Sequence, residues 1–428
     1  MLRYAILFIV TGTLMAAANA ATGETGSGPQ FNGGHAKYLF LLNSFADDSL
    51  FRDFVETPAV DNNGELRLKF DWQADKVSLV TDYQLIAQQG DSFTLANNLP
   101  GSVLVSRPVA DDELRLFDLS HVITEDNNSA LSHRLDRLYV EYAGSHAVGR
   151  FGRQAISWGN GLVYTPMDFI NPFAPSAIDK EYKTGDDMLY GQYLQQSGND
   201  LQAAWVFRRD INGDVTDEVD TIAAKYHGFA GNREYDLLLA QHYDDNIVGV
   251  GGITDIGGAI WRGDITLTRT NNNLAQTKNV TSLVTSLSYS WLSWGHNVSG
   301  IVEYFYNGFG QTNGDYSPAA LASNSDLVER IIRGELFTLG RHYIAASAMI
   351  EMTPLWLLTP NIFINASDGS FLAQLVTTYD IKQDWQLLAA FSVPIGASGT
   401  EYGGIDSAIA GKQLSSDLNV FAQLAWYF

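Results

Sequence analysis

The amino-acid sequence predicts an all-β protein, a transmembrane antiparallel β-barrel of about 18 strands with long extracellular loops. Three observations favour this fold: apolar residues recur at every second position, short and long connections alternate, and the chain begins with an export signal. Bacterial barrels have an even number of strands, and 16 strands is the alternative because boundaries taken from a sequence slip by a few residues.

The first 20 of the 428 residues have the parts of a secretory signal peptide. An apolar stretch follows Arg3 and ends in Ala18-Asn19-Ala20, which matches an A-x-A cleavage site. Thr11-Gly12-Thr13 interrupts this stretch, whereas a retained membrane helix needs about 20 uninterrupted apolar residues. We therefore expect export and cleavage near Ala20-Ala21.

Beyond the signal peptide, the chain is predicted to hold a single membrane domain. No later window is apolar over the roughly 18 residues that a membrane-spanning helix requires. Residues 21–35 are too few for a plug domain, so we expect a flexible periplasmic leader there. The barrel is then expected over residues 36–428, in the outer membrane of a Gram-negative bacterium.

The strand signal is strongest at the C-terminus. Val420, Ala422, Leu424, Trp426 and Phe428 alternate with the residues of the opposite face, and the chain stops on an aromatic residue. A last strand of this period with a terminal Phe is similar to the sorting signal of outer-membrane barrels. Leu424, Trp426 and Phe428 are therefore the predicted assembly signal, and the barrel-assembly machinery is an expected partner.

The same period recurs upstream, with charge on one face only. Many of these segments begin or end in Trp or Tyr, as expected for the aromatic girdles at the two surfaces of a membrane. The clearest segments lie at 66–72, 77–83, 138–142, 261–268, 283–291, 356–364 and 385–393. One face of each is expected to contact outer-membrane lipids.

Charged residues opposite the lipid-facing set are expected in the lumen, because an Arg or Lys at the membrane midplane costs about 2–4 kcal/mol. The predicted lumen residues are Arg67, Lys69, Arg137, Glu141, Arg150, Arg262, Asp264 and Glu303. Arg134, Arg137, Arg150 and Arg153 cluster on one predicted hairpin, and such a basic strip would guide anions or acidic polysaccharides. The alternative is a structural network in which Glu141 and acidic loop residues pair with these arginines.

Connections alternate in length, as they do between the tight periplasmic turns and the long extracellular loops of a barrel. Short links are expected near 73–74, 143–145, 231–232, 293–295, 353–354 and 383–384. Long ones are expected near 86–133, 155–187, 308–340 and 394–416. Within the third of these, residues 325–333 predict a short amphipathic helix capped by Ser325.

Residues 136–187 differ from the rest of the chain in their concentration of glycine, proline and charge. Gly152-Arg153-Gln154 runs into Trp158-Gly159, and Asn171-Pro172 follows. This segment resembles an uncharacterised group of porin-like outer-membrane proteins of Gram-negative bacteria that share the G-R-Q, W-G and N-P elements. The resemblance covers about an eighth of the chain. It implies the barrel fold and the location and leaves the substrate open.

We expect this segment to form a long loop after an outward-running strand. Gly159 and Gly161 permit turns closed to other residues, and Pro172 and Pro175 stiffen the path. Folded inward, such a loop narrows a channel, and its charges would set selectivity. The predicted constriction residues are Asp168, Asp179, Lys180, Glu181, Lys183, Asp186 and Asp187. The alternative is a solvated extracellular loop whose charges have no specific role.

Composition argues against several classes of function. Lys and Arg number 26 against 48 Asp and Glu, a formal net charge of -22, which argues against a nucleic-acid partner. The chain has no cysteine, which excludes thiolate zinc sites and cysteine nucleophiles. Its eight histidines are scattered and no catalytic or nucleotide-binding motif is present. We therefore expect no enzyme activity and no catalytic, cofactor-binding or metal site.

These features together predict a porin-like channel for the passive diffusion of small polar solutes or ions. A water-filled lumen needs about 16 strands or more, which the chain length permits. A selective exporter or importer that works with an inner-membrane partner is one alternative, and a structural or adhesive barrel is another. A homotrimer is compatible with the sequence, because alternation does not distinguish a subunit contact from a lipid-facing surface.

Overall fold

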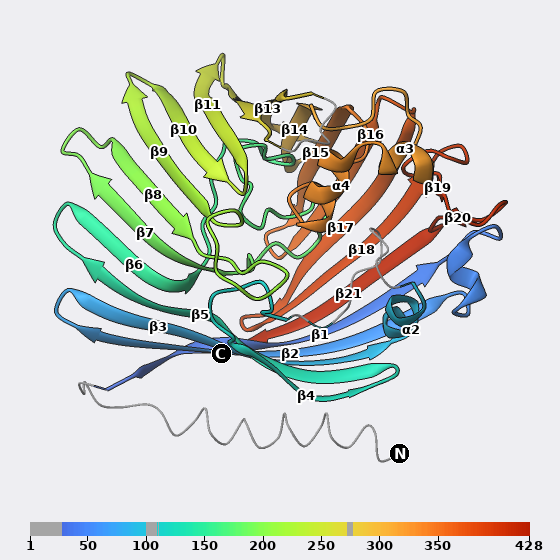
Figure 1. The fold of residues 1–428 in the computed structure, drawn as a ribbon, viewed down its shortest axis with the longest axis horizontal. Coiled ribbons are helices and arrows are strands. Elements are labelled where there is room, and N and C mark those ends of the chain that lie inside the picture. Colours follow the sequence, from blue (N-terminus) through green and yellow to red (C-terminus); the bar gives the residue numbers. More distant parts are fainter. Residues whose placement is uncertain (1–27, 100–108, 110, 272–276) are drawn as a thin grey trace.

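The computed structural model describes residues 28–99, 109, 111–271 and 277–428. The chain forms a closed antiparallel β-barrel of 18 strands, which confirms the predicted fold and strand number (Figure 1). The expected signal peptide and residues 21–27 of the expected leader lie outside the described residues.

Consecutive barrel strands pair antiparallel, and the last strand closes the barrel by pairing with the first. The first nine are β1 (Gln30–Ser44), β2 (Ala59–Ala74), β3 (Val77–Gly90), β5 (Ser129–Ala143), β6 (Ala147–Gln154), β7 (Asp186–Leu194), β8 (Asp200–Val206), β9 (Thr221–Ala230) and β10 (Arg233–His242). The others are β11 (Asp245–Ile256), β12 (Ala259–Arg269), β13 (Asn279–Ser293), β14 (His296–Tyr306), β15 (His342–Thr353), β16 (Trp356–Asn365), β17 (Ser370–Lys382), β18 (Trp385–Ile395) and β21 (Leu418–Tyr427).

The remaining elements lie in the connections. β4 (Ser120–Asp126) pairs with residues 129–134 of β5, and β6 pairs with residues 138–143 on the same edge of β5. β4 therefore extends the barrel wall beyond the end of β6. The others are η1 (Leu50–Asp53), α2 (Asp91–Asn98), α3 (Pro318–Ala322), α4 (Ser325–Ile332), β19 (Ile405–Asp406) and β20 (Gln413–Leu414). No helix in the described ranges is long and apolar enough to cross a membrane.

The two ends of the barrel differ in the length of their connections. At one end all eight turns are short: 75–76, 144–146, 195–199, 231–232, 257–258, 294–295, 354–355 and 383–384. The six predicted short links lie at or beside six of them, and the turns at 195–199 and 257–258 are outside the predicted set. The other end carries the long connections, together with tight turns at 243–244 and 366–369. We call three of the long ones the inner loop (155–185), the helical loop (307–341) and the last loop (396–417).

Side chains alternate between an apolar outer face and a polar interior, as the strand geometry requires. On β14, Val302 is 58% exposed on the outside, whereas the neighbouring Glu303 is completely buried in the interior. Leu287 on β13 and Leu239 on β10 are likewise exposed, at 46% and 63%. An exposed apolar belt around a closed barrel is stable in lipid and unfavourable in water.

Three predicted boundaries differ most clearly from the structure. The long connection expected at 86–133 is confined to 91–128, because β3 runs to Gly90 and β5 begins at Ser129. β1 begins at Gln30, so residues 30–35 of the expected flexible leader belong to the barrel. Phe31 packs against Phe70 with ring centroids 5.5 Å apart, and His35 is completely buried, which fixes this segment in the wall. The inner loop ends at residue 185 instead of 187, because the next two residues already pair with β6.

The predicted amphipathic helix is present as α4, but its cap differs from the prediction. Asn324, not Ser325, is the N-cap, and the Asn324 side chain accepts a hydrogen bond from the backbone N–H of Leu327. Leu327 is completely buried, so the apolar face of α4 packs inward.

The outward position of Leu287 predicts the cost of a charge there. Leu287→Arg should lower the free energy of unfolding by about 2–4 kcal/mol, because the guanidinium would lie in lipid. Urea-induced unfolding in lipid vesicles measures this cost. Ser290→Arg on the inner face of the same strand is the matched control and should lose much less. Equal losses would contradict the assignment of the two faces.

Candidate channel constriction

The inner loop leaves the barrel wall after β6 and runs through the interior before it returns at β7. Figure 1 shows this green segment inside the ring of strands. Its backbone has no strand or helix over 155–185, so its amide groups need other partners. The first half of the loop finds them on the wall of β12 and β14.

Two wall carboxylates bind consecutive amide groups of the loop. The Asp264 carboxylate accepts hydrogen bonds from the backbone N–H of Asn160 (2.6 Å) and Gly161 (3.2 Å). Glu303 accepts from the three following N–H groups, at 2.8 Å from Leu162, 3.0 Å from Val163 and 2.6 Å from Tyr164. Hydrogen bonds to a charged acceptor are about twice as strong as neutral ones, so this clamp holds five successive residues to the wall.

Glycine makes the clamp sterically feasible. A Cβ on Gly161 would lie 1.9 Å from the carbonyl oxygen of Tyr164, which no side chain tolerates. Gly159 has φ +97°, a conformation open mainly to glycine. The amide side chain of Asn160 adds hydrogen bonds to Asp264 (2.7 Å) and Asp236 (3.0 Å). The Trp158-Gly159-Asn160-Gly161 motif is thus the tight turn that presents the amides to the wall.

Apolar packing supports the clamp on both sides. On one side, Trp158 and Met167 are buried in a cluster against the inner wall of β7 to β11, and the Trp158 indole N–H donates to Gln202 (2.7 Å). On the other side, the Tyr164 ring stacks on Phe305 with centroids 4.8 Å apart and planes 10° apart.

The second half of the inner loop contacts the opposite wall. The carbonyl of Ser176 accepts a hydrogen bond from Gln374 on β17 (3.0 Å). Further along, Lys37 on β1 forms ion pairs with both Asp179 and Glu181, each at 2.7 Å. The loop therefore spans the lumen from β14 to β1. Burial opposes ionisation of Asp179, but its hydrogen bonds, first of all from Lys37, leave its pKa below the ordinary value.

Lys183 ties the two ends of the loop together. Its ammonium group lies 2.6 Å from Asp168 and also donates to the carbonyl of Ile156 (2.7 Å) and the hydroxyl of Ser157 (3.1 Å). Burial raises the pKa of Asp168 and lowers that of Lys183, and the facing opposite charge counters both shifts. Removing one partner would leave a buried charge without its counterion.

Five of the seven predicted constriction residues lie in the inner loop, in three kinds of position. Asp168 and Lys183 form the buried tie, and Asp179 and Glu181 are anchored on Lys37. Lys180 is exposed, and its ammonium donates only to the carbonyl of Pro175 among the described residues (3.1 Å). It is the predicted cation best placed to meet a solute.

Asp186 and Asp187 lie outside the loop, as the first two residues of β7. Asp187 is completely buried and binds Arg153 at 2.9 Å, while Asp186 pairs with Arg208 at 3.1 Å. These carboxylates are bound within the structure and are not available to a solute. The sequence places them in the loop because nothing local marks where the strand resumes.

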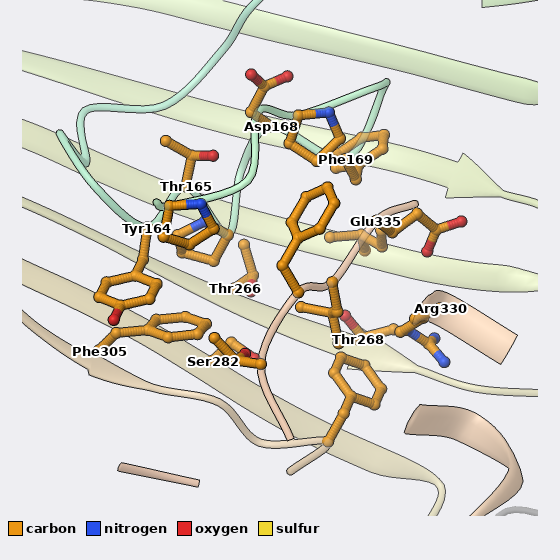
Figure 2. A pocket seen from close by; sticks show the side chains of 18 of the residues that line it. Tyr164, Thr165, Asp168, Phe169, Thr266, Thr268, Ser282, Phe305, Arg330 and Glu335 are labelled. Atoms are coloured by element: carbon orange, nitrogen blue, oxygen red, sulfur yellow. The ribbon is translucent and has the colours of Figure 1, made fainter. Parts of the chain in front are cut away.

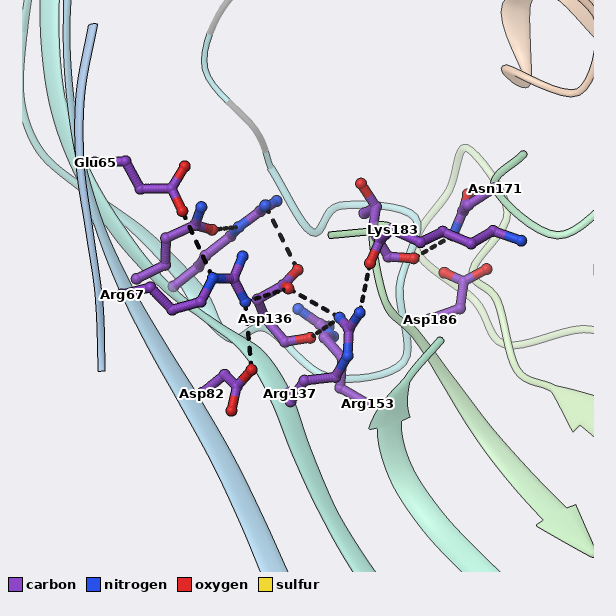
Figure 3. A network of polar contacts seen from close by, with 12 residues as sticks. Glu65, Arg67, Asp82, Asp136, Arg137, Arg153, Asn171, Lys183 and Asp186 are labelled. Atoms are coloured by element: carbon purple, nitrogen blue, oxygen red, sulfur yellow. Dashed lines mark hydrogen bonds and ion pairs between the residues drawn. The ribbon is translucent and has the colours of Figure 1, made fainter. Parts of the chain in front are cut away.

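The arginines of the predicted basic strip are paired with carboxylates. Asp136 is the centre of one network, since Arg67 (2.8 Å) and Arg137 (2.9 Å) both bind its Oδ2 (Figure 3). Arg134 lies 3.5 Å from the same carboxylate. Arg153 binds Asp112 and Asp187, and Arg150 donates to Glu141 at 2.5 Å. This geometry matches the alternative of a structural network.

The other predicted residues are placed as follows. Lys69 lies 4.8 Å from the ring of Tyr182, and Arg67 lies 4.0 Å from the same ring, so β2 contacts the inner loop. Arg262 donates to Ser288 on the neighbouring strand at 2.8 Å. Leu424 and Trp426 are on β21, and the C-terminal Phe428 exchanges two backbone hydrogen bonds with Gly34 (2.8 and 3.1 Å), which join the chain ends across the barrel seam.

A cavity separates the inner loop from the helical loop (Figure 2). The helical loop is fixed to the wall by an ion pair of Arg330 with Asp245 and by a hydrogen bond between His242 and Glu335 (2.9 Å). The cavity is lined by aromatic rings and by hydroxyls of β12 and β13, among them Tyr164, Phe169, Phe305, Thr266, Thr268 and Ser282. Two inward-folded segments thus narrow the same part of the lumen.

Sequence reasoning misses several residues of this site. Asn160 and Tyr164 are outside the predicted set, although the Trp-Gly-Asn-Gly motif is a signal for the former. Asp236, Asp245 and Glu335 carry no local signal, since their partners lie far along the chain. Over the described ranges, no three His, Asp or Glu side chains are arranged to hold a metal ion.

Comparisons with known proteins give the fold alone. No protein-family model matches the chain, and no curated protein matches it. Solved structures do. OccAB4 of Acinetobacter baumannii is 9% identical with a TM-score of 0.52, covering 94% of this chain and 99% of that one. The outer membrane protein OprD of Pseudomonas aeruginosa is 8% identical with a TM-score of 0.51, covering 92% and 93%.

A BenF-like porin of Pseudomonas fluorescens is 10% identical with a TM-score of 0.50 and covers 94% of this chain and 98% of that chain. The protein therefore has the barrel fold of outer-membrane porins, as its resemblance to porin-like proteins implies. The resemblance to one porin-like group through the G-R-Q, W-G and N-P elements stays a prediction from the sequence. Because one fold serves several functions, function has to be argued from the lumen.

The clamp makes a prediction about the inner loop. Glu303→Ala should speed hydrogen exchange at the amides of Leu162, Val163 and Tyr164 at least tenfold, because about 1.5–3 kcal/mol is lost for each hydrogen bond to a charged group. Hydrogen–deuterium exchange with mass spectrometry on the folded barrel measures this. Glu141→Ala removes another lumen carboxylate and should leave these amides unchanged. Unchanged exchange in Glu303→Ala would contradict the clamp.

Proposed function

We propose that the protein is an outer-membrane channel for the passive diffusion of small polar solutes or ions, with the inner loop as its constriction. The observation that carries this proposal is the Asp264 and Glu303 clamp, which holds a non-regular loop across the inside of a closed barrel. A barrel that served only as a scaffold would not need a fixed segment at this depth.

The rest of the molecule supports the same function. An apolar exterior suits lipid, and the interior carries hydroxyl and charged side chains that water can hydrate. Eighteen strands are enough for an aqueous lumen. An exporter requires a docking surface for its partner, an adhesive barrel requires a large external domain, and an enzyme requires a catalytic cluster. No contact among the described residues favours any of these three alternatives.

Two further roles belong to this proposal. Leu424, Trp426 and Phe428 act as the signal for the barrel-assembly machinery, since they end the strand that closes the barrel. A homotrimer would use part of the apolar outer face. Neither role is needed for passage of a solute through a single barrel.

The exposed Lys180 and the buried Lys183 should affect transport differently. Lys180 offers its charge to the lumen, so it contributes to ion selectivity. Lys183 neutralises Asp168 inside the loop, so its removal leaves a buried carboxylate and loosens the constriction. The paired arginines of β2, β5 and β6 contribute less net charge than their number suggests, because carboxylates face them.

Single-channel recording in planar bilayers under a salt gradient tests the proposal. The purified wild type should give stable open steps. Lys180→Ala should shift the reversal potential toward cation selectivity at nearly unchanged conductance, because one exposed positive charge is lost. Lys183→Ala should instead give noisy steps of altered conductance.

Arg262→Ala removes a lumen cation whose side chain donates to Ser288 on β13 rather than to the inner loop, so it is the matched control and is expected to keep the wild-type steps. A properly folded wild-type barrel that never conducts would refute the passive channel. Steps with identical selectivity in all variants would refute the place of the inner loop at the constriction, while leaving the channel itself.

A further inference from the structure

One carboxylate joins three connections at the long-loop end of the barrel. Glu401, in the last loop, accepts a hydrogen bond from the backbone N–H of Leu339 in the helical loop (3.0 Å). It also accepts one from the side chain of Asn365 at the end of β16 (2.7 Å). Its own N–H donates to Asp368, in the turn between β16 and β17 (2.9 Å).

The same carboxylate reaches the packing that holds the inner loop. The Tyr343 hydroxyl, on β15, donates to Glu401 at 2.5 Å. The completely buried ring of Tyr343 lies 5.7 Å from that of Tyr164. Tyr164 in turn stacks on Phe305 and gives its backbone N–H to Glu303. A short chain of contacts therefore connects the last loop to the clamp.

The surroundings of Glu401 suit a neutral carboxyl better than a charged one. Its partners are a phenol, an amide side chain and a backbone amide, and none is positively charged. Asp368, on the neighbouring turn, adds a like charge. Burial and this charge raise the pKa of Glu401 to about 7, although its three donors favour ionisation.

The other titratable groups that face Glu401 are tyrosines. Tyr316 of the helical loop, Tyr402 of the last loop and Tyr164 of the inner loop approach it, as does Tyr343. Burial raises the pKa of Tyr164, Tyr316 and Tyr402 above the ordinary value. These three hydroxyls therefore stay neutral near pH 7, and none supplies a counterion.

We propose that Glu401 is a positioning residue whose ionisation loosens the junction of the outer loops and, through Tyr343 and Tyr164, the constriction. The coupling, which is the effect of Glu401 on the constriction, rests on the proposed channel function. The junction, which is the set of loop contacts around Glu401, does not. The folded-state pKa of Glu401 is raised above the ordinary 4.5. The protonated carboxyl therefore stabilises the junction fully below about pH 4.5, and this stabilisation is lost as the pH rises through about 7. The channel is then tight in acid and looser in mild alkali.

Limited proteolysis tests the junction without any need for transport. Trypsin cleavage after Lys412 in the last loop is compared, at pH 6 and pH 8.5, with cleavage after the exposed Lys76 in the short turn 75–76. The ratio of the two rates cancels the pH dependence of trypsin. The rate after Lys412 divided by the rate after Lys76 should rise severalfold with pH in the wild type. It should stay constant in Glu401→Gln, which keeps the size of the side chain and an acceptor oxygen.

Asp112→Asn is the matched control for a buried loop carboxylate. Burial opposes ionisation of Asp112, but hydrogen bonds from Arg153 and Arg115 lower its pKa to about 2, so its charge is constant over this pH range. Its variant should keep the wild-type pH profile. A wild-type ratio that does not change with pH, or a pH-dependent ratio that persists in Glu401→Gln, would overturn the proposal.

Channel recording over the same pH range tests the coupling. The wild type should show larger or noisier steps at pH 8.5 than at pH 6, and both Glu401→Gln and Tyr343→Phe should lose this difference. Tyr343→Phe should keep the pH dependence of cleavage, because the junction persists while its link to the inner loop is cut. Conductance that is independent of pH in the wild type overturns the coupling and leaves the channel. A barrel that conducts at no pH refutes the proposed function and the coupling together, and the cleavage ratio still decides the junction.

Discussion

The clamp between wall carboxylates and loop amides is the interaction on which the interior of this barrel depends. A chain segment without strand or helix leaves its N–H groups without regular partners, and such groups are costly to bury unpaired. Asp264 and Glu303 solve this by accepting five consecutive amides with two charged side chains. The loop can therefore follow an irregular path across the lumen and still be fixed in position.

The same constraint explains where charge is placed in the molecule. Carboxylates outnumber cations, and many of those inside the barrel bind either an arginine or a row of backbone amides. Most lumen arginines are thus structural, as the network around Asp136 illustrates. A charge that remains exposed, such as that of Lys180, then has a disproportionate influence on the field that a solute meets.

The long-loop end is organised as a set of linked layers. The inner loop lies on the wall, the helical loop packs beside it across the cavity, and the last loop reaches both neighbours through Glu401. Aromatic rings connect these layers because they bury large area and still offer a hydroxyl for a hydrogen bond. A change in one loop is therefore transmitted by packing and does not require a change in the strands.

The amino-acid sequence is sufficient to predict the barrel, because two-residue alternation, short turns and a terminal aromatic strand are local patterns that lipid and strand geometry impose. It also marked the unusual inner loop through its glycines and prolines. It did not determine that β1 starts at Gln30, or that Asp187 binds Arg153, since no local pattern separates a buried ion pair from a solvated charge.

Which carboxylates hold the loop depends on contacts between residues far apart in the chain. Asn160 and Asp264 are 104 residues apart, and Tyr164 and Glu303 are 139 apart. Alternation assigns Asp264 and Glu303 to the lumen, but it cannot say what they bind there. The groups that these two carboxylates bind are decided by closure of the sheet, because closure brings distant strands to face one another. A buried loop amide can then bind only the acceptors that lie within hydrogen-bond distance.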